Sequence, residues 1–249
     1  MSAEEFNFVA AAVGTHKESV VALVSMGLVA ILLVVSGLSA AAAVKRAKNP
    51  LVPESRLTVR NLFELLAEFL IWMGDIAMGK ENRKYLPFAA TLFVFILAMN
   101  LLGLVPGFVM PTHMAEINAG LALTVFVLYN FWGIRELGIF KYLKHMFGPF
   151  SGWMFPLGVF LFCIELISHT IRPLSLTVRL YGNMTGDHLV LGVFTEMTQG
   201  LFERGIPLPI PVIFYFMGTL VSLIQAFVFT ILTMIYISLA TAHEEEDHH

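Results

Sequence analysis

The sequence predicts an all-α polytopic membrane protein with about five membrane-embedded helices and one interfacial amphipathic helix. Hydrophobic residues make up 57% of the 249 positions and charged residues only 13%, and the mean hydropathy is +0.79. Soluble domains are close to a quarter charged, so this chain has too little charge to cover a surface that faces water. It also contains several apolar runs of about 20 residues, the length that crosses a bilayer.

The first apolar run, residues 19–44, predicts a retained membrane span. A secretory signal has an apolar stretch of roughly 7–15 residues that follows a basic segment. Here the run is longer, and the opening segment MSAEEFNF has no basic residue. We read no further signal in the first 18 residues.

Residues 57–79 predict an amphipathic helix between the first and second spans. Its apolar residues recur at helical spacing: Leu62, Leu65, Leu66, Phe69 and Met73. The polar residues Arg60, Glu64 and Glu68 lie opposite. Such a helix lies in the membrane interface or packs on other subunits, and the sequence leaves both open.

Two ordinary spans, 86–105 and 119–134, precede two unusual segments, 153–202 and 210–240. Residues 160–202 contain no ordinary loop signal and would extend roughly 65 Å as a helix. This is about twice the hydrocarbon thickness, so we expect strong tilt. The proline-rich link GIPLPIP predicts an antiparallel hairpin of the two helices. No internal repeat or linker is present, so we expect one domain, 1–249.

Basic residues predict the orientation, because Lys and Arg concentrate in cytoplasmic loops. Between the first two spans they are Lys45, Arg46, Lys48, Arg56, Arg60, Lys80, Arg83 and Lys84. The next loop, GFVMPTHMAEIN, has none, and the loop after it has Arg135, Lys141 and Lys144. We therefore expect the N-terminus outside and the acidic tail HEEEDHH in the cytoplasm.

A polar stripe runs through the apolar segment 153–202. Glu165, Arg172 and Arg179 repeat every seven residues. Four pairs are i,i+4 neighbours on a helix: Glu165–His169, Ser175–Arg179, Arg179–Asn183 and Asn183–Asp187. An arginine at mid-bilayer costs at least about 2.5–3.5 kcal/mol. We therefore expect Arg179 to face a cavity, a partner helix or a conduction path, and Arg172 to pair with Glu165 or to reach the interface.

The last apolar helix predicts a facing polar stripe. Its members are Ser222, Gln225, Thr233 and Tyr236, on one side with Phe229. We expect the Gln225 amide to hydrogen-bond a guanidinium across the hairpin. An ordinary polar contact between helices is the alternative.

Two late segments, PLSLTVRLYGNMTGDHLVLG and LIQAFVFTILTMIYISLA, resemble subunit a of the F-type ATP synthases. MNLLGLVPG and PTHMAEINAGLAL are similar to earlier signatures of that family. The resemblance covers most of the chain from about residue 51 to 240. It rests mainly on the R-L-x-G-N-M motif on a late helix that precedes a Q-A-F helix.

The resemblance implies a role for several residues. Arg179 would be the family's essential arginine facing the rotating ring of c subunits, with Asn183 one turn along and Gln225 opposite. His188 would line an access channel, and Glu165 matches an acidic position on the same helix. The other candidates for ion translocation are Asp187, Ser175, His169, Asn100 and Tyr236, of which Asn100 fits the family's second-span motif.

One position departs from the family pattern. Members with histidine at position 188 often carry an acid on the last helix, about where Gly218 stands in this sequence. Asp187, Glu196 or Glu203 can substitute for that missing acid. The path of each half-channel therefore stays open at the sequence level.

The implied function is an ion-translocating stator subunit, non-catalytic itself, with two half-channels to the ring carboxylates. His169, His188 and Asp187 favour protons over sodium ions, because histidine titrates near neutral pH. The implied partners are the c-subunit ring, b-type peripheral stalk subunits and the lipid bilayer, in an energy-coupling membrane such as the bacterial inner membrane. We expect no cofactor, metal or nucleic acid, and no nucleotide, since G-x-x-x-x-G-K-[ST] is absent.

Two other classes remain open. The chain can be a stand-alone secondary transporter or channel in which Arg179 binds an anion or gates the path. The absence of a repeat and the small number of spans disfavour that class. It can also be a non-conducting scaffold whose polar stripe only holds helices together.

Overall fold

The described part of the protein is helical throughout its regular structure, which confirms the predicted all-α class. The computed structural model describes residues 7–15, 17–46, 58–105, 107–108, 110–147, 155–203 and 210–241. Within these ranges five helices are long and apolar enough to cross a membrane. They are α2 (Glu18–Arg46), α4 (Leu86–Leu102), α5 (Ala115–Leu137), α7 (Phe155–Glu203) and α8 (Ile210–Thr241).

Shorter helices join these spans. They are α1 (Phe8–Val13), α3 (Val59–Met78) and α6 (Ile139–Phe147), with the 3-10 turns η1 (Lys80–Tyr85) and η2 (Pro111–His113). Glycines in conformations that other residues rarely adopt end two helices: Gly79, with φ 75°, ends α3, and Gly138, with φ 78°, separates α5 from α6. These sharp stops let consecutive helices change direction within one residue.

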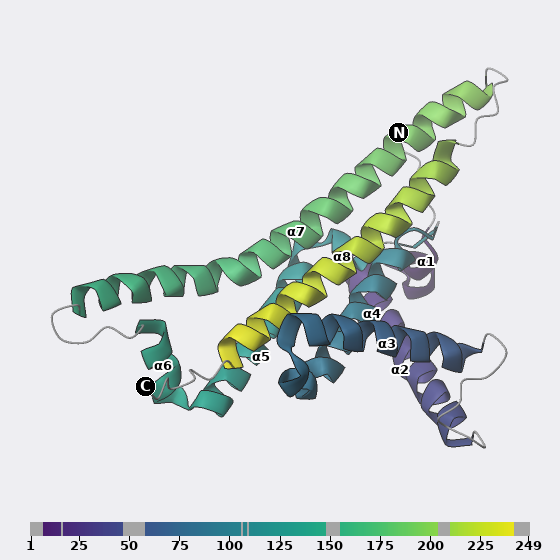
Figure 1. The fold of residues 1–249 in the computed structure, drawn as a ribbon. Coiled ribbons are helices and arrows are strands. Elements are labelled where there is room, and N and C mark those ends of the chain that lie inside the picture. The colour runs from purple at the N-terminus through teal and green to yellow at the C-terminus, as the bar shows by residue number, and fades with distance from the viewer. Residues whose placement is uncertain are drawn as a thin grey trace.

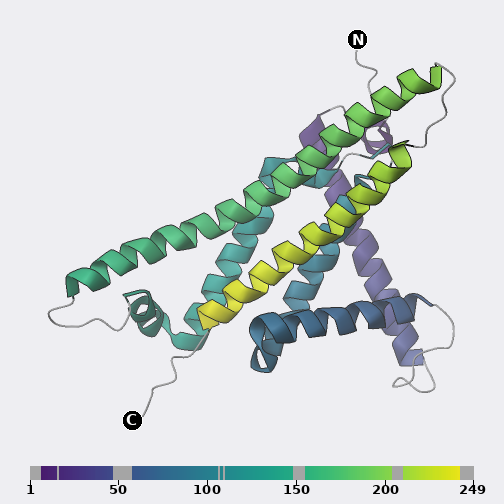
Figure 2. The same ribbon diagram turned by 45° about the horizontal axis from the view of Figure 1, so that its top comes forward.

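Helix α3 lies crosswise to α2, α4 and α5 (Figure 2) and is not among the helices long and apolar enough to span. Leu70 and Met73 are buried, whereas Trp72 and Ile76 are exposed. Arg60 was expected on the water-facing side, and this was wrong. It is 3% exposed, and its Nε donates to Glu64 Oε1 at 2.6 Å. The i,i+4 pairing supplies the counter-charge that such burial requires. The interfacial location of α3 stays a prediction.

The core is centred on α8, which packs against α3, α4, α5 and α7. Large buried side chains fill the contacts, among them Phe93 and Met99 of α4, Tyr129 of α5, and Phe229 and Met234 of α8. Helix α2 lies to one side and exposes much of its apolar surface. In a membrane protein such surface faces lipid or other subunits.

The last two long helices, α7 and α8, run side by side in opposite directions and lie obliquely across the other spans (Figures 1 and 2). This confirms the predicted hairpin, although most of the linking segment GIPLPIP lies outside the described residues. Helix α7 continues through Pro173, and the Thr177 hydroxyl donates to the Pro173 carbonyl at 2.9 Å. Leu176, Leu180 and Met184 of α7 are fully buried, so the opposite face of α7 is left outward.

Candidate functional site

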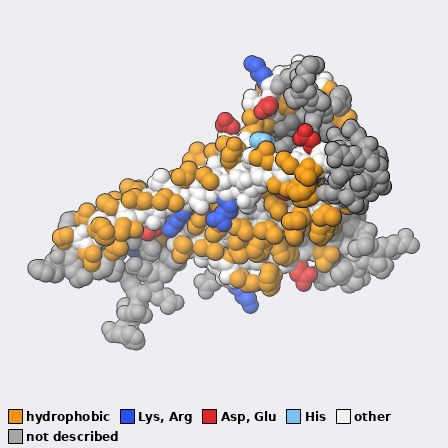
Figure 3. Space-filling model, turned by 90° about the horizontal axis from the view of Figure 1, so that it is seen from above, with side chains coloured by type: hydrophobic (Ala, Val, Ile, Leu, Met, Phe, Trp, Pro, Cys, Tyr) orange, Lys and Arg blue, Asp and Glu red, His pale blue; other side chains and the backbone are white. Residues whose placement is uncertain are grey.

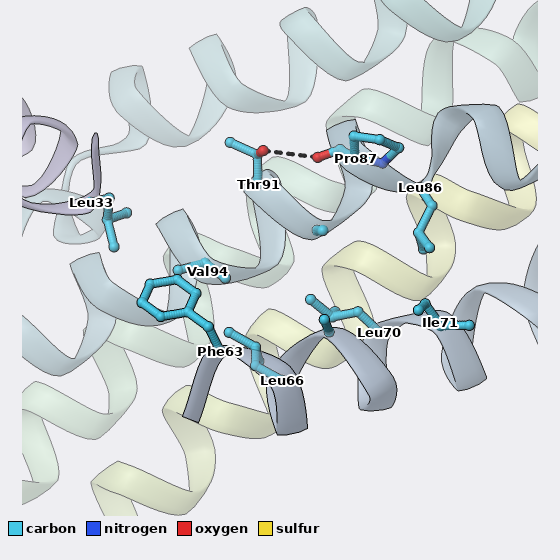
Figure 4. A pocket seen from close by; sticks show the side chains of 11 residues that line it. Leu33, Phe63, Leu66, Leu70, Ile71, Leu86, Pro87, Thr91 and Val94 are labelled. Atoms are coloured by element: carbon cyan, nitrogen blue, oxygen red, sulfur yellow. Dashed lines mark hydrogen bonds between the residues drawn. The ribbon is translucent and has the colours of Figure 1, made fainter. Parts of the chain in front are cut away.

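The apolar groove between α2, α3 and α4 has no group suited to an ion. Its volume is about 370 Å³, and Leu33, Leu66, Leu70 and Val94 contribute to its lining (Figure 4). The Thr91 hydroxyl is already used, because it donates to the Pro87 carbonyl of its own helix at 2.8 Å. The ionisable side chains of the long helices are concentrated on α7 instead.

Arg179 lies near the middle of α7 and is partly exposed. Its neighbour Leu180 is buried in the core, whereas Val178 is exposed. Among the described residues, the Arg179 guanidinium has no hydrogen bond and no ion pair. Seen from above, the described surface carries many hydrophobic side chains, with a few basic and acidic ones among them (Figure 3). The arginine thus carries a charge next to apolar surface without a counter-charge from the described chain.

One turn beyond Arg179, a side-chain hydrogen bond links the two helices of the hairpin. Asn183 Nδ2 donates to Gln225 Oε1 of α8 at 2.8 Å. Gln225 is 2% exposed, and its Nε2 has no hydrogen-bond partner among the described residues. The expected bond from Gln225 to a guanidinium across the hairpin is therefore not formed; the nearest polar side chain of α7 takes its place. This leaves the Arg179 guanidinium available to another molecule.

We expect the Asn183–Gln225 bond to contribute modestly to the stability of the hairpin. In a double-mutant cycle of Asn183→Ala and Gln225→Ala, the coupling energy should be about 0.6 kcal/mol, the usual scale for such bonds in membrane proteins. Thermal unfolding of the purified protein in detergent measures it. Strictly additive effects of the two substitutions would contradict the bond.

A second polar group, the Glu165 cluster, lies on α7 toward α5 and α6. Arg172 Nη2 donates to Glu165 Oε1 at 3.3 Å, which confirms the expected pairing. His169 Nε2 also lies 3.3 Å from Glu165 Oε1. The Arg172 guanidinium lies 5.2 Å from the centre of the Tyr236 ring of α8, a cation–π distance. The charges of this cluster therefore have partners on two helices.

Aromatic hydroxyls close the buried side of the Glu165 cluster. The Tyr129 hydroxyl of α5 lies 3.1 Å from His169 Nδ1. The Tyr142 ring of α6 packs edge-on against the His169 ring, and its hydroxyl donates to Asn130 Oδ1 at 2.7 Å. Burial raises the pKa of Tyr142 to about 12, with a further contribution from Tyr129. Tyr142 thus stays a neutral hydrogen-bond donor at physiological pH.

A third polar group lies at the other end of the hairpin, where the missing acid was expected. A Cβ atom at Gly218 would lie 2.9 Å from Asp187 Oδ2 and 2.8 Å from Leu104 Cδ2. The Asp187 carboxylate thus fills the space over Gly218 from the neighbouring helix. Among the three acids that could substitute, the structure brings Asp187 to this position. Glu196 is exposed elsewhere on α7, and the side chain of Glu203 lies outside the described residues.

Asn100 is buried at the same end of the bundle as Leu104. Its Oδ1 accepts from the Thr112 hydroxyl at 2.8 Å, and Asn118 Nδ2 donates to the Thr112 carbonyl at 2.7 Å. The Asn100 Nδ2 atom has no partner among the described residues. Asn100 thus ties the turn η2 to α4, and Asn118 ties it to α5.

Two of the residues predicted for ion translocation are not placed in any of these polar groups. Ser175 is partly buried four residues before Arg179, and the side chain of His188 lies outside the described part. Conversely, three residues that take part in these groups were not predicted from the sequence: Tyr129, Tyr142 and Thr112. Polar side chains within or beside an apolar span were the available signal, but Tyr and Thr are common at helix contacts and did not stand out.

Arg179 lies between Glu165 and Asp187 in the sequence of α7. On a helix with a rise of about 1.5 Å per residue, Asp187 lies roughly 12 Å from it in one direction and Glu165 roughly 21 Å in the other. The acids thus flank a positive charge, Arg179, that has no partner among the described residues. Such an arrangement can pass a cation to each side while opposing its passage across the middle.

These features define a class: a polytopic helical membrane protein with ionisable residues along one membrane-embedded helix. A sequence profile of the ATP synthase A chain family matches residues 23–238. The chain belongs to this family, whose members are membrane-sector subunits and not themselves catalytic.

Relatives in several bacteria are similar over most of their length. ATP synthase subunit a of Bdellovibrio bacteriovorus is 38% identical over 220 residues, which cover 88% of this chain and 91% of the relative. The subunit a of Trichlorobacter lovleyi is 45% identical over 187 residues, 74% of this chain and 76% of the relative. That of Solidesulfovibrio magneticus is 44% identical over 189 residues, 74% and 73% respectively.

Proposed function

We propose that this chain is the proton-translocating stator subunit of an F-type ATP synthase, and that Arg179 separates two half-channels. Each half-channel leads from one side of the membrane to carboxylates on a rotating c-subunit ring. A carboxylate that faces lipid must be neutral, because an unpaired charge there is costly. Each ring carboxylate therefore has to release and regain its proton while it faces this chain.

The observation that carries this proposal is the unpaired guanidinium of Arg179 at the edge of an exposed apolar helix face. Arginine keeps its charge at any physiological pH, and a lone charge in lipid costs at least about 2.5–3.5 kcal/mol. The described residues offer this charge no counter-ion, which supports a partner from another subunit. An ionised ring carboxylate has the right charge and supplies it transiently.

The surface around Arg179 supports docking of the ring. Ile171, Leu174 and Val178 are exposed on α7 at helical spacing, and such a stripe fits the apolar outer helices of a ring. The exposed apolar residues of α2, such as Ile31 and Leu38, are available to lipid or to b-type peripheral stalk subunits.

We assign the two half-channels to the two acidic groups. The Glu165 cluster, with His169, Arg172 and Tyr236, serves the cytoplasmic side, next to the basic residues Arg135 and Lys141. Asp187, with Asn100 at the same end of the bundle and His188 as the next residue in the sequence, serves the outside. Asn183, Gln225 and Ser175 lie along the hairpin between them. The orientation, with the N-terminus outside and the C-terminus in the cytoplasm, belongs to the same proposal.

The charge of Arg179 couples ion flow to rotation. It stabilises the carboxylate in its ionised form as that group passes between the half-channels, and it repels a proton moving directly from one to the other. A membrane potential supplies about 2.3 kcal/mol per charge per 100 mV. Several protons are therefore required for each ATP made elsewhere in the complex.

Reconstitution distinguishes this function from a stand-alone transporter. We expect liposomes with the purified chain alone to show no potential-driven proton flux, because the path lacks the ring carboxylates that carry the proton through the middle. Liposomes with the complete membrane sector should conduct, as measured with a pH-sensitive dye inside. Flux through the chain alone, above that of empty liposomes, would favour the transporter class.

A further inference from the structure

The Glu165 cluster contains a buried imidazole that the general half-channel scheme does not require. His169 is 8% exposed, and each of its ring nitrogens has a polar neighbour. Nε2 lies 3.3 Å from Glu165 Oε1, and Nδ1 lies 3.1 Å from the Tyr129 hydroxyl. Tyr129 is itself only 1% exposed. A buried imidazole held at both nitrogens by titratable groups is arranged for proton exchange.

We propose that Glu165 and His169 form a proton-exchange pair in the half-channel assigned to the cytoplasmic side, with Tyr129 as the positioning residue. This rests on the proposed function. In the step, the O–H bond of the Glu165 carboxyl breaks and a bond forms between that proton and His169 Nε2. A carboxylate and an imidazolium result, and the reverse step returns the proton to Glu165.

The Glu165 side chain is more exposed than that of His169, so a proton from outside the cluster reaches Glu165 first. The Glu165 side chain is 39% exposed, whereas that of His169 is 11% exposed. Glu165 therefore meets the water or the ring, and His169 holds the proton behind it. Arg172, always charged, pairs with the same Glu165 oxygen. It keeps the carboxylate paired whether or not His169 carries a second proton.

Tyr129 decides which imidazole nitrogen takes part in exchange. When its hydroxyl oxygen accepts a hydrogen bond from Nδ1–H, that nitrogen stays protonated and Nε2 remains the one that gains and loses a proton. Imidazole tautomers are commonly set in this way by the partner of the other nitrogen. Groups facing His169 include Glu165 on α7, Tyr129 on α5 and Tyr142 on α6. Arg172 pairs with Glu165, and Tyr236 of α8 lies against Arg172 and Tyr129. Among them, only His169 is of a type that ordinarily changes charge near neutral pH.

The test is the pH dependence of ATP-driven proton pumping in inverted vesicles, where the cytoplasmic face meets the medium. We expect His169→Gln to lower the medium pH above which pumping falls to half of its maximum, because without the imidazole the cluster holds no group of a type that titrates near neutral pH. Tyr129→Phe should shift it in the same direction by less. Tyr142→Phe, which keeps the ring against His169 and removes a hydroxyl bonded elsewhere, should leave it unchanged.

The outcomes separate this inference from the proposed function. If the pH profiles of pumping by His169→Gln and Tyr129→Phe coincide with that of the parent, the exchange pair is overturned. This holds whatever the result for Arg179→Ala. A uniform loss at every pH, equal for Tyr129→Phe and Tyr142→Phe, would show that the cluster is only structural. Assembly is checked in each case by the amount of intact complex on native gels. If His169→Gln does not assemble, Tyr129→Phe alone decides.

Discussion

Replacing Arg179 with alanine is expected to lower ATP-driven proton pumping in inverted membrane vesicles by about 100-fold while the complex still assembles. The arginine makes no hydrogen bond or ion pair within the described chain, so its removal should not disturb the hairpin. It removes the only charge that we assign to the passing ring carboxylate. A loss of about 3 kcal/mol of charge stabilisation corresponds to a fall in rate of about 100-fold.

Two further variants separate charge from packing at this position. Arg179→Lys keeps a positive charge but lacks the planar guanidinium fork, so we expect it to pump weakly. Val178→Ala, at an exposed residue of the proposed ring-docking stripe, changes only apolar contact, so we expect a much smaller loss of pumping than in Arg179→Ala. Pumping by an assembled Arg179→Ala complex would mean that the polar stripe is structural, and it would remove the basis of the proposed mechanism.

The fold was predictable because few backbone structures can cross a lipid bilayer. Backbone groups in a bilayer must bond within their own segment or close a barrel, so apolar runs of the right length predict helices. The length of segment 153–202 also predicted the oblique hairpin. Arg60 was mispredicted because helical spacing alone does not show which side of an amphipathic helix packs against neighbours. Its i,i+4 bond to Glu64 allows burial on the side expected to face water.

The candidate site was predictable along one helix and not between helices. The seven-residue repeat of Glu165, Arg172 and Arg179 and the i,i+4 pairs follow from helical geometry. The contact of Tyr129 with His169 and that of Asp187 with Gly218 depend on the rotation and offset of α5, α7 and α8. Those quantities are set by side-chain packing over the whole bundle, which sequence spacing does not encode.

The second large effect is expected at Asp187 and Gly218. Asp187→Asn should lower pumping by about tenfold or more, because it removes the titratable group that we assign to the outer half-channel, and positioned proton-transfer groups typically contribute 10²–10⁴-fold. Gly218→Ala should cause a smaller loss. The added Cβ would lie 2.9 Å from Asp187 Oδ2 and 2.8 Å from Leu104 Cδ2. Both are ends of side chains, which can move, but the carboxylate then leaves its position.

Moving the carboxylate between the helices gives the sharpest test, because the two positions share one space. We expect Asp187→Gly to lose pumping and the double variant Asp187→Gly, Gly218→Asp to recover a large part of it. Thr219→Ala is the matched control on α8, since among the described residues the Thr219 hydroxyl bonds its own helix, at the Tyr215 carbonyl. If Asp187→Gly pumps like the parent, no carboxylate is needed at this point. If the double variant pumps no better than Asp187→Gly, the requirement lies in Asp187 itself, because the same charge in the same space then fails to replace it.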